Sequence, residues 1–186
     1  MAKHLIDIEC FIPHFELSIK DYITKESWDY QINEFRDDRL KLKEYLRTFT
    51  GFSLGFNSKH YDIPVLCHCD AHNYWLDQPW DIFCQNAKTF SDDLILGTDD
   101  RLAYKYHNYR HFKFEVIDIF LYWSKLIRIS KRIPLKSVGI QMGYPVVQDL
   151  PYSPYIKELS KEQIAEIHHY CSVHDLGILE MLIKEK

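Results

Sequence analysis

The sequence predicts an α/β fold, and three observations support this. Residues 4–10 alternate apolar and polar side chains, and residues 15–19 repeat the alternation after a short turn, which is typical of an antiparallel pair of strands. Residues 31–49 and 160–184 carry apolar side chains at helical spacing among charged ones. A short apolar segment at 52–56 predicts a buried strand between these two helices.

The rest of the chain predicts one more helix and one more strand. A helix is expected after Asp62, whose side chain suits a helix N-terminus, and a strand is expected over residues 115–120. Ser160 and Gln163 have the spacing of a capping box, so the last helix is expected to begin there. Neither a repeat nor a long linker interrupts the sequence, and we expect a single domain over residues 1–186.

Composition excludes several classes of protein. No segment approaches the roughly 18 apolar residues of a membrane span, and the polar start Met1–His4 is unlike a signal peptide. Five cysteines, an odd number without framework spacing, favour a reducing compartment, so we expect a cytoplasmic protein. The net charge of −4 argues against a protein that coats DNA, but it does not exclude one that binds nucleic acid through a single basic strip.

Asp7 and Glu9 are the first candidate functional residues. Side chains two apart in a strand share a face, so these carboxylates should point the same way, about 7 Å apart along the strand. Ile6 and Ile8 would then be buried behind them. Two adjacent carboxylates repel each other unless a cation lies between them. The alternative is an edge strand with a polar face.

Two later segments carry candidate partners for this acidic pair. Residues 57–62 (Asn-Ser-Lys-His-Tyr-Asp) follow the buried strand, and Tyr170 and Asp175 lie near the end of the chain. Taken alone, Asp62 could simply cap the helix that follows it. Taken with the acidic pair, Asp62 and Asp175 complete a set of four carboxylates, which could hold two divalent cations, Mg²⁺ or Mn²⁺, for phosphodiester hydrolysis.

In this order the motifs resemble those of the DEDD superfamily of 3′–5′ exonucleases, specifically the proofreading domains of family B and phage DNA polymerases. The matching residues, in chain order, are Asp7, Glu9, Asn57, Tyr61, Asp62, Tyr170 and Asp175. The stretches Val116–Phe120 and Pro134–Val138 are similar to the segment between motifs in phage polymerases. The resemblance covers nearly the whole chain and implies an RNase H-like fold, with a mixed five-stranded sheet flanked by helices.

The resemblance also implies a role for each residue. Asp7, Glu9 and Asp175 would bind the metal that activates water, and Asp7 with Asp62 would hold the second metal at the leaving 3′-oxygen. The residues placed against the substrate are Asn57 and Tyr61, at the terminal nucleotides, and Lys136, near the scissile phosphate.

One spacing departs from the family pattern. The tyrosine subgroup has Tyr four residues before Asp, whereas Tyr170 lies five before Asp175 and Cys171 occupies the expected position. On a regular helix, four residues leave two side chains about 40° apart and five leave them about 140° apart. A π-type bulge would absorb the extra residue; alternatively, the backbone could turn as in the histidine subgroup. Otherwise Tyr170 only packs and the site is degraded. Neighbouring candidates for the general base are His168, His169 and His174.

Basic and aromatic residues suggest contact with nucleic acid. A stretch of twelve residues without an acid contains Lys125, Arg128, Lys131, Arg132 and Lys136, enough to neutralise several phosphates. Aromatics alternate with cations at Tyr104, Tyr106, Tyr109, Phe112 and Phe114, which suits either base stacking or core packing. The segment Cys67-His68-Cys69 with His72 has poor spacing for tetrahedral zinc, and a helix after Asp62 explains it better.

These observations lead us to expect a stand-alone, metal-dependent 3′–5′ exonuclease acting on single-stranded DNA or 3′ ends, with RNA a possible substrate. No polymerase segment follows the third motif, so we expect trimming to occur alone or in trans to a replication or repair partner. Two alternatives remain open: a catalytically impaired RNase H-like module that binds nucleic acid or a replication protein, and a 3′–5′ exoribonuclease.

Overall fold

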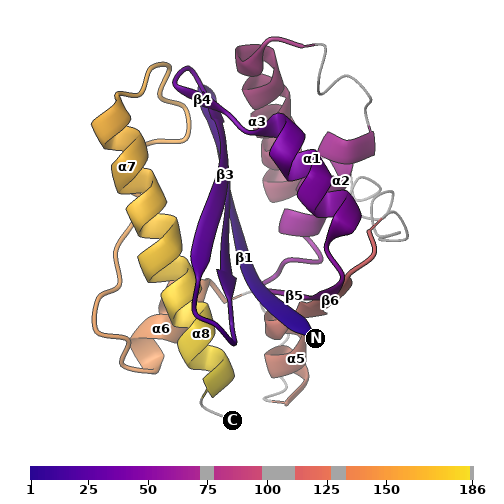
Figure 1. Cartoon of the computed structure of the whole chain (residues 1–186). Coiled ribbons are helices and arrows are strands. Elements are labelled where there is room, and N and C mark those ends of the chain that lie inside the picture. The colour runs from indigo at the N-terminus through magenta and orange to yellow at the C-terminus, as the bar shows by residue number, and fades with distance from the viewer. Residues whose placement is uncertain (72–77, 98–111, 127–132, 185–186) are drawn as a thin grey trace.

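The computed structural model describes residues 1–71, 78–97, 112–126 and 133–184. In this part of the chain, one mixed six-stranded sheet lies between two groups of helices (Figure 1). The strands follow the order β4-β3-β2-β1-β5-β6. Their bounds are β1 Ala2–Phe11, β2 His14–Asp21, β3 Ser27–Asn33, β4 Arg36–Asp37, β5 Gly51–Gly55 and β6 Glu115–Asp118.

The sheet combines an antiparallel half with a parallel half. The predicted hairpin is confirmed, because β1 and β2 pair antiparallel along their length, with Glu9 directly opposite Glu16. On its other side β1 pairs in parallel with β5, which pairs in parallel with β6. Because β1, β5 and β6 run the same way, their carboxyl ends meet at one edge of the sheet.

The prediction of five strands is wrong, because a tight turn adds a short sixth strand. The Asn33 side chain accepts the backbone N–H groups of Phe35, at 2.9 Å, and Arg36, at 3.0 Å. Such a side-chain-to-backbone turn reverses the chain within a few residues and brings Arg36–Asp37 back beside β3 as β4.

The helix predicted over residues 31–49 is only partly present. Ile32, fully buried, lies in β3 opposite Phe15, and α1 covers only Arg39–Thr48. The apolar residues that fitted a helical spacing are used in strand pairing instead, because burial on the sheet overrides the local pattern. The helix predicted after Asp62 is confirmed as α2 (Asp62–Ala71); three further helices were not predicted, namely α3 (Trp80–Leu96), α5 (Ile119–Leu126) and α6 (Leu135–Gln141).

Alternation along β1 divides the core between the two faces of the sheet. Ile6 and Ile8 pack with residues of α1, α2 and α3 on one face, whereas Leu5 packs against the C-terminal helix on the other. Figure 1 shows these helices on opposite sides of the strands. Asp7 and Glu9 have the same parity as Leu5, so they face the C-terminal helix. None of the described helices has the length and apolar character needed to cross a lipid bilayer.

The helix predicted over residues 160–184 is present but contains a π segment. Its capping box is confirmed: the Ser160 hydroxyl accepts the N–H of Gln163, and the Gln163 side chain accepts the N–H of Ser160. The N–H of Leu176 bonds to the carbonyl of Cys171, five residues earlier, as in a π-helix. The three parts are α7 (Lys161–His169), the π segment η3 (Tyr170–Asp175) and α8 (Leu176–Lys184).

Candidate metal centre

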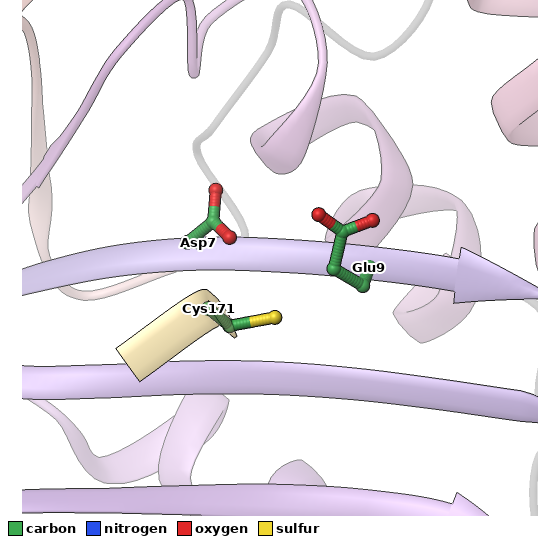
Figure 2. Close-up of side chains that lie close together, drawn as sticks. All are labelled: Asp7, Glu9 and Cys171. Carbon is green, nitrogen blue, oxygen red and sulfur yellow. The ribbon is translucent and has the colours of Figure 1, made fainter. Parts of the chain in front are cut away.

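Asp7 and Glu9 lie side by side on β1, as predicted. Figure 2 shows their carboxyl groups on the same side of the strand, with the thiol of Cys171 beside them. One ligand atom from each of the three residues lies within 4.8 Å of the others. Cys171 is buried, at 1% exposure, because it belongs to the π segment that crosses this face of the sheet.

Asp62 and Asp175 complete the acidic cluster from two other segments. Asp62 begins α2, and its carboxylate accepts a hydrogen bond from the backbone N–H of Ile8, which fixes it against β1. Asp175 ends the π segment. Both carboxylates act electrostatically on Asp7 and on Glu9, so four acids from three distant segments lie near one another. The three ligand atoms that lie within 4.8 Å of one another include neither Asp62 nor Asp175.

The carboxyl groups of this cluster disfavour simultaneous ionisation. Burial, reinforced by neighbouring carboxylates, raises the pKa of both Asp7 and Glu9 well above the usual values. Burial raises the pKa of Asp62 to about 7, despite backbone hydrogen bonds that oppose it. Burial likewise raises the pKa of Asp175 to about 6, against the opposing effects of Tyr170 and Lys136. A bound cation would remove this repulsion.

The π segment brings Tyr170 to the cluster. Of the alternatives that the five-residue spacing left open, the π-type bulge is the one present, since η3 spans Tyr170–Asp175. The Tyr170 side chain is hydrogen-bonded to the Asp175 carboxylate. Burial and the nearby carboxylates raise the pKa of the phenol, so its hydroxyl stays protonated and donates to Asp175. Tyr170 is therefore better suited to orienting the Asp175 carboxylate than to removing a proton from the attacking water.

Lys136 also lies beside the cluster. Its ammonium group is 5.4 Å from the centre of the Tyr170 ring and 3.0 Å from the Asp149 carboxylate. It acts electrostatically on both Glu9 and Asp175. Lys136, at the start of α6, therefore offsets part of the negative charge of the acidic cluster.

A cavity of about 300 Å³ adjoins the carboxylates and contains both predicted nucleotide-contacting residues. Asn57 has a left-handed backbone (φ 59°), and its buried side-chain oxygen has no hydrogen-bond partner among the described residues. The Tyr61 hydroxyl lies 2.8 Å from that of Ser91 on α3. The lining residues are Asp7, Phe56, Asn57, Tyr61, Asp62, Phe120, Ile133, Pro134 and Leu135.

Asp118, which was not predicted to have a role, shapes this cavity from the end of β6. Its carboxylate accepts the backbone N–H groups of Asn57 (3.1 Å), Lys59 (3.0 Å) and Leu121 (3.2 Å). These bonds hold the strained turn at Asn57 against the start of α5. The available signal was an acid within the strand predicted over residues 115–120, at the carboxyl edge of the sheet.

Glu16 is a second residue to which no sequence pattern pointed. It lies opposite Glu9 across the hairpin, fully buried, and is bonded to Ser18 (2.7 Å), His168 (2.6 Å) and His14 (3.2 Å). Burial alone would raise its pKa, but the hydrogen bonds from the two histidines outweigh this and lower the pKa to about 2. Glu16 therefore remains ionised and ties β2 to the end of α7.

Several predicted contacts lie elsewhere or outside the described residues. Arg128, Lys131 and Arg132 fall outside them, as do Tyr104, Tyr106 and Tyr109. Phe112 and Phe114 stack on each other, with ring centres 4.9 Å apart, and belong to the core rather than to a base-stacking surface. Cys67 and Cys69 are likewise buried in the core, as a helix after Asp62 requires.

Comparisons with protein-family models, with curated proteins and with solved structures found no significant match to this chain.

Proposed function

We propose that this protein is a metal-dependent 3′–5′ exonuclease that hydrolyses single-stranded DNA. The observation that carries the proposal is the meeting of Asp7, Glu9, Asp62 and Asp175, which come from three segments far apart in sequence. Asp62 and Asp175 are buried and Asp7 and Glu9 are half-buried, and acids in such positions seldom gather without a function, because each raises the cost of ionising the others. The antiparallel β3-β2-β1 half and the parallel β1-β5-β6 half support the proposal that the fold is RNase H-like.

The four carboxylates suit two hard divalent cations, Mg²⁺ or Mn²⁺. All donors are carboxylate oxygens, which these ions prefer. One oxygen of Asp7 is buried and has no hydrogen-bond partner among the described residues, which leaves it free for a ligand. Asp7, Glu9 and Asp175 would hold one ion, and Asp7 with Asp62 the other. When bound, the ions would supply an activated water and neutralise charge at the scissile phosphate.

The neighbouring residues supply what a 3′ end needs. The cavity beside Asp7 and Asp62 has a volume in the range of small-ligand pockets, so it could receive a terminal nucleotide. The unpartnered side-chain oxygen of Asn57 offers an acceptor for a sugar hydroxyl. Lys136 carries a positive charge beside the cluster, where a phosphate would lie. Tyr170 holds Asp175 by a hydrogen bond, which fixes the orientation of a ligand carboxylate.

The decisive experiment incubates the protein with 3′-labelled single-stranded DNA and RNA of one sequence, in Mg²⁺, Mn²⁺ or EDTA. We expect labelled mononucleotide to be released from DNA only when metal is present. Asp7→Asn should abolish this release while leaving single-strand binding largely intact, because it removes a metal ligand but none of the basic side chains. Glu44→Gln is the matched control, since Glu44 is exposed on α1, beyond the opposite face of the sheet. Digestion in EDTA at the wild-type rate would refute the two-metal proposal.

One observation favours a second candidate, a catalytically impaired module that binds nucleic acid. The thiol of Cys171 lies within 4.8 Å of the ligand atoms of Asp7 and Glu9, a position better suited to an oxygen donor or a water. In that case the wild-type protein would bind single strands but release no nucleotide with either metal. Preferential cleavage of the RNA would instead indicate an exoribonuclease.

A further inference from the structure

Tyr144, in the turn after α6, contacts the π segment directly. Its hydroxyl donates to the backbone carbonyl of Val173, at 2.8 Å. Its ring lies so close to Gly177 that a Cβ built there would be 2.0 Å from the hydroxyl oxygen. Only glycine at position 177 therefore allows this approach, and Tyr144 and Gly177 act as a matched pair.

The turn that carries Tyr144 is shaped to reach the π segment. Gly143 has a left-handed backbone (φ 73°), and the N–H of Tyr144 bonds to the carbonyl of Gly139 at 2.9 Å, so α6 ends in a tight reversal. Two residues later, the carbonyl of Val146 lies 2.9 Å from Nδ1 of His174, and this nitrogen is the donor. The turn is therefore hydrogen-bonded to the π segment at two successive residues, Val173 and His174.

The helix α6, which precedes this turn, packs closely against α8. Gly139 packs against Ile178 of α8 so closely that an added Cβ would be 2.9 Å from the isoleucine side chain. The same helix carries Lys136, which lies over the Tyr170 ring. The turn, Lys136 and the π segment are therefore held in one arrangement beside the acidic cluster.

We infer that Tyr144 is a positioning residue that maintains the π segment and thereby keeps Tyr170 in register with Asp175. This inference rests on the proposed function for its consequences in catalysis, but its structural part does not. A π turn is rare and less favourable than a regular α turn, so something must compensate for it. A side chain that bonds to a helix carbonyl is one cause of such a departure. Without it, a shift of one residue would rotate Tyr170 away by about 100° and bring Cys171 to its place.

The test compares Tyr144→Phe with Tyr152→Phe. The first change keeps the ring and removes the bond to Val173; the control removes a tyrosine bond to Glu166 on α7, outside the π segment. Amide hydrogen exchange over residues 170–178 reports on the π segment without relying on activity. We expect Tyr144→Phe to raise this exchange about tenfold and to weaken Mn²⁺ binding about three- to tenfold, the size of one lost hydrogen bond. Tyr152→Phe should change neither quantity.

Deletion of Val173 gives a sharper comparison. The deletion removes the extra residue, so Tyr170 would lie four residues before Asp175 on a regular helix. The Tyr144 hydroxyl would then have no π segment to maintain. Tyr144→Phe should then have no further effect on exchange, on Mn²⁺ affinity or on kcat. The inference would be overturned if Tyr144→Phe had an equal effect with and without Val173. It would also be overturned if Tyr144→Phe alone left amide exchange over residues 170–178 at the wild-type rate. The single-variant comparison decides the matter if the deletion does not fold. A wild-type protein that binds no Mn²⁺ and cleaves no DNA would refute the proposed function, while exchange would still report on Tyr144.

Discussion

The side chain of Tyr170 is hydrogen-bonded to the carboxylate of Asp175, although five residues separate them along one helix. On a regular helix they would point about 140° apart, so the bond exists only because the intervening turn is a π segment. The π segment therefore does more than accommodate an extra residue. It converts a spacing that departs from the resembled family into a direct contact at the acidic cluster.

The first prediction concerns this bond. Tyr170→Phe should lower kcat about 10²-fold, in the range of lost acid–base or orienting assistance. Mn²⁺ affinity at pH 8 should change by no more than about threefold, because the variant keeps all four carboxylates and, unlike Tyr144→Phe, leaves the bond that maintains the π segment in place. Single-turnover rates with titrated Mn²⁺ separate these two effects. If the rate is unchanged, His168, His169 and His174 should be substituted next. Wild-type activity in all four variants would mean that none of these side chains acts as the base.

The sequence predicted the local parts of the site well. Alternation along residues 4–10 placed Asp7 and Glu9 on one face of a strand, and β1 shows that arrangement. The extra residue before Asp175 suggested a π-type bulge as one of three alternatives, and η3 is such a bulge. Such features depend on the spacing of near neighbours, which the sequence displays directly.

The sequence could not predict contacts that depend on distant partners. Glu16 and His168 are 152 residues apart, and nothing in either segment indicates that they meet. The same holds for Asp118 with Asn57, and for Tyr144 with Val173. The helix predicted over residues 31–49 is only partly present for a related reason, because the pairing of Ile32 with Phe15 decided the structure of its first residues rather than the local spacing.

The second prediction concerns Asp118, which accepts three backbone N–H groups in a buried position. Asp118→Ala should lower the free energy of unfolding by about 2 kcal/mol, since buried donors would lose their acceptor. It should also raise KM for the 3′ end more than it lowers kcat, because the turn at Asn57 would no longer be held. Urea denaturation and steady-state kinetics measure these effects, and Glu44→Ala serves as the exposed control. If Asp118→Ala had the same urea midpoint as the wild type, the turn at Asn57 would not need this carboxylate.

The third prediction concerns the pH dependence of stability without metal. The pKa of Asp62 is raised to about 7 and that of Asp175 to about 6, both from a usual value of 3.8. An acid whose pKa is higher in the folded state binds its proton more tightly there. Its stabilising contribution is therefore complete below pH about 4 and is lost as the pH rises towards 7. In EDTA, Tm should fall between pH 5 and pH 8.

Divalent metal should reverse this loss. A cation that binds only the folded state neutralises the carboxylates, so Mg²⁺ or Mn²⁺ should raise Tm more at pH 8 than at pH 5. Asp62→Asn should flatten the pH dependence in EDTA and reduce the metal effect. Thermal denaturation across this pH range, with and without metal, provides the measurement. A Tm that rises between pH 5 and pH 8 in EDTA for both proteins would contradict the expected electrostatic repulsion.

The fourth prediction concerns Cys171, whose thiol lies beside Asp7 and Glu9. Burial, followed by the nearby carboxylates, raises the pKa of this thiol well above its usual value, so it remains protonated. A protonated thiol is a poor ligand for Mg²⁺ or Mn²⁺, which prefer oxygen. Cys171→Ala should therefore keep nuclease activity within about threefold of wild type with either metal.

Cys84→Ala is the matched control for this substitution, because Cys84 is equally buried but lies in the core on the opposite face of the sheet. Both variants lose a similar volume of packing, so any difference between them in metal affinity reflects the position beside the carboxylates. If Cys171→Ala alone loses more than tenfold in Mn²⁺ affinity, the thiol is a ligand, and the site should then be tested with softer metals. If the wild type is inactive and Cys171→Ala is active, the thiol obstructs the acidic cluster. That result would support the alternative of a catalytically impaired module that binds nucleic acid.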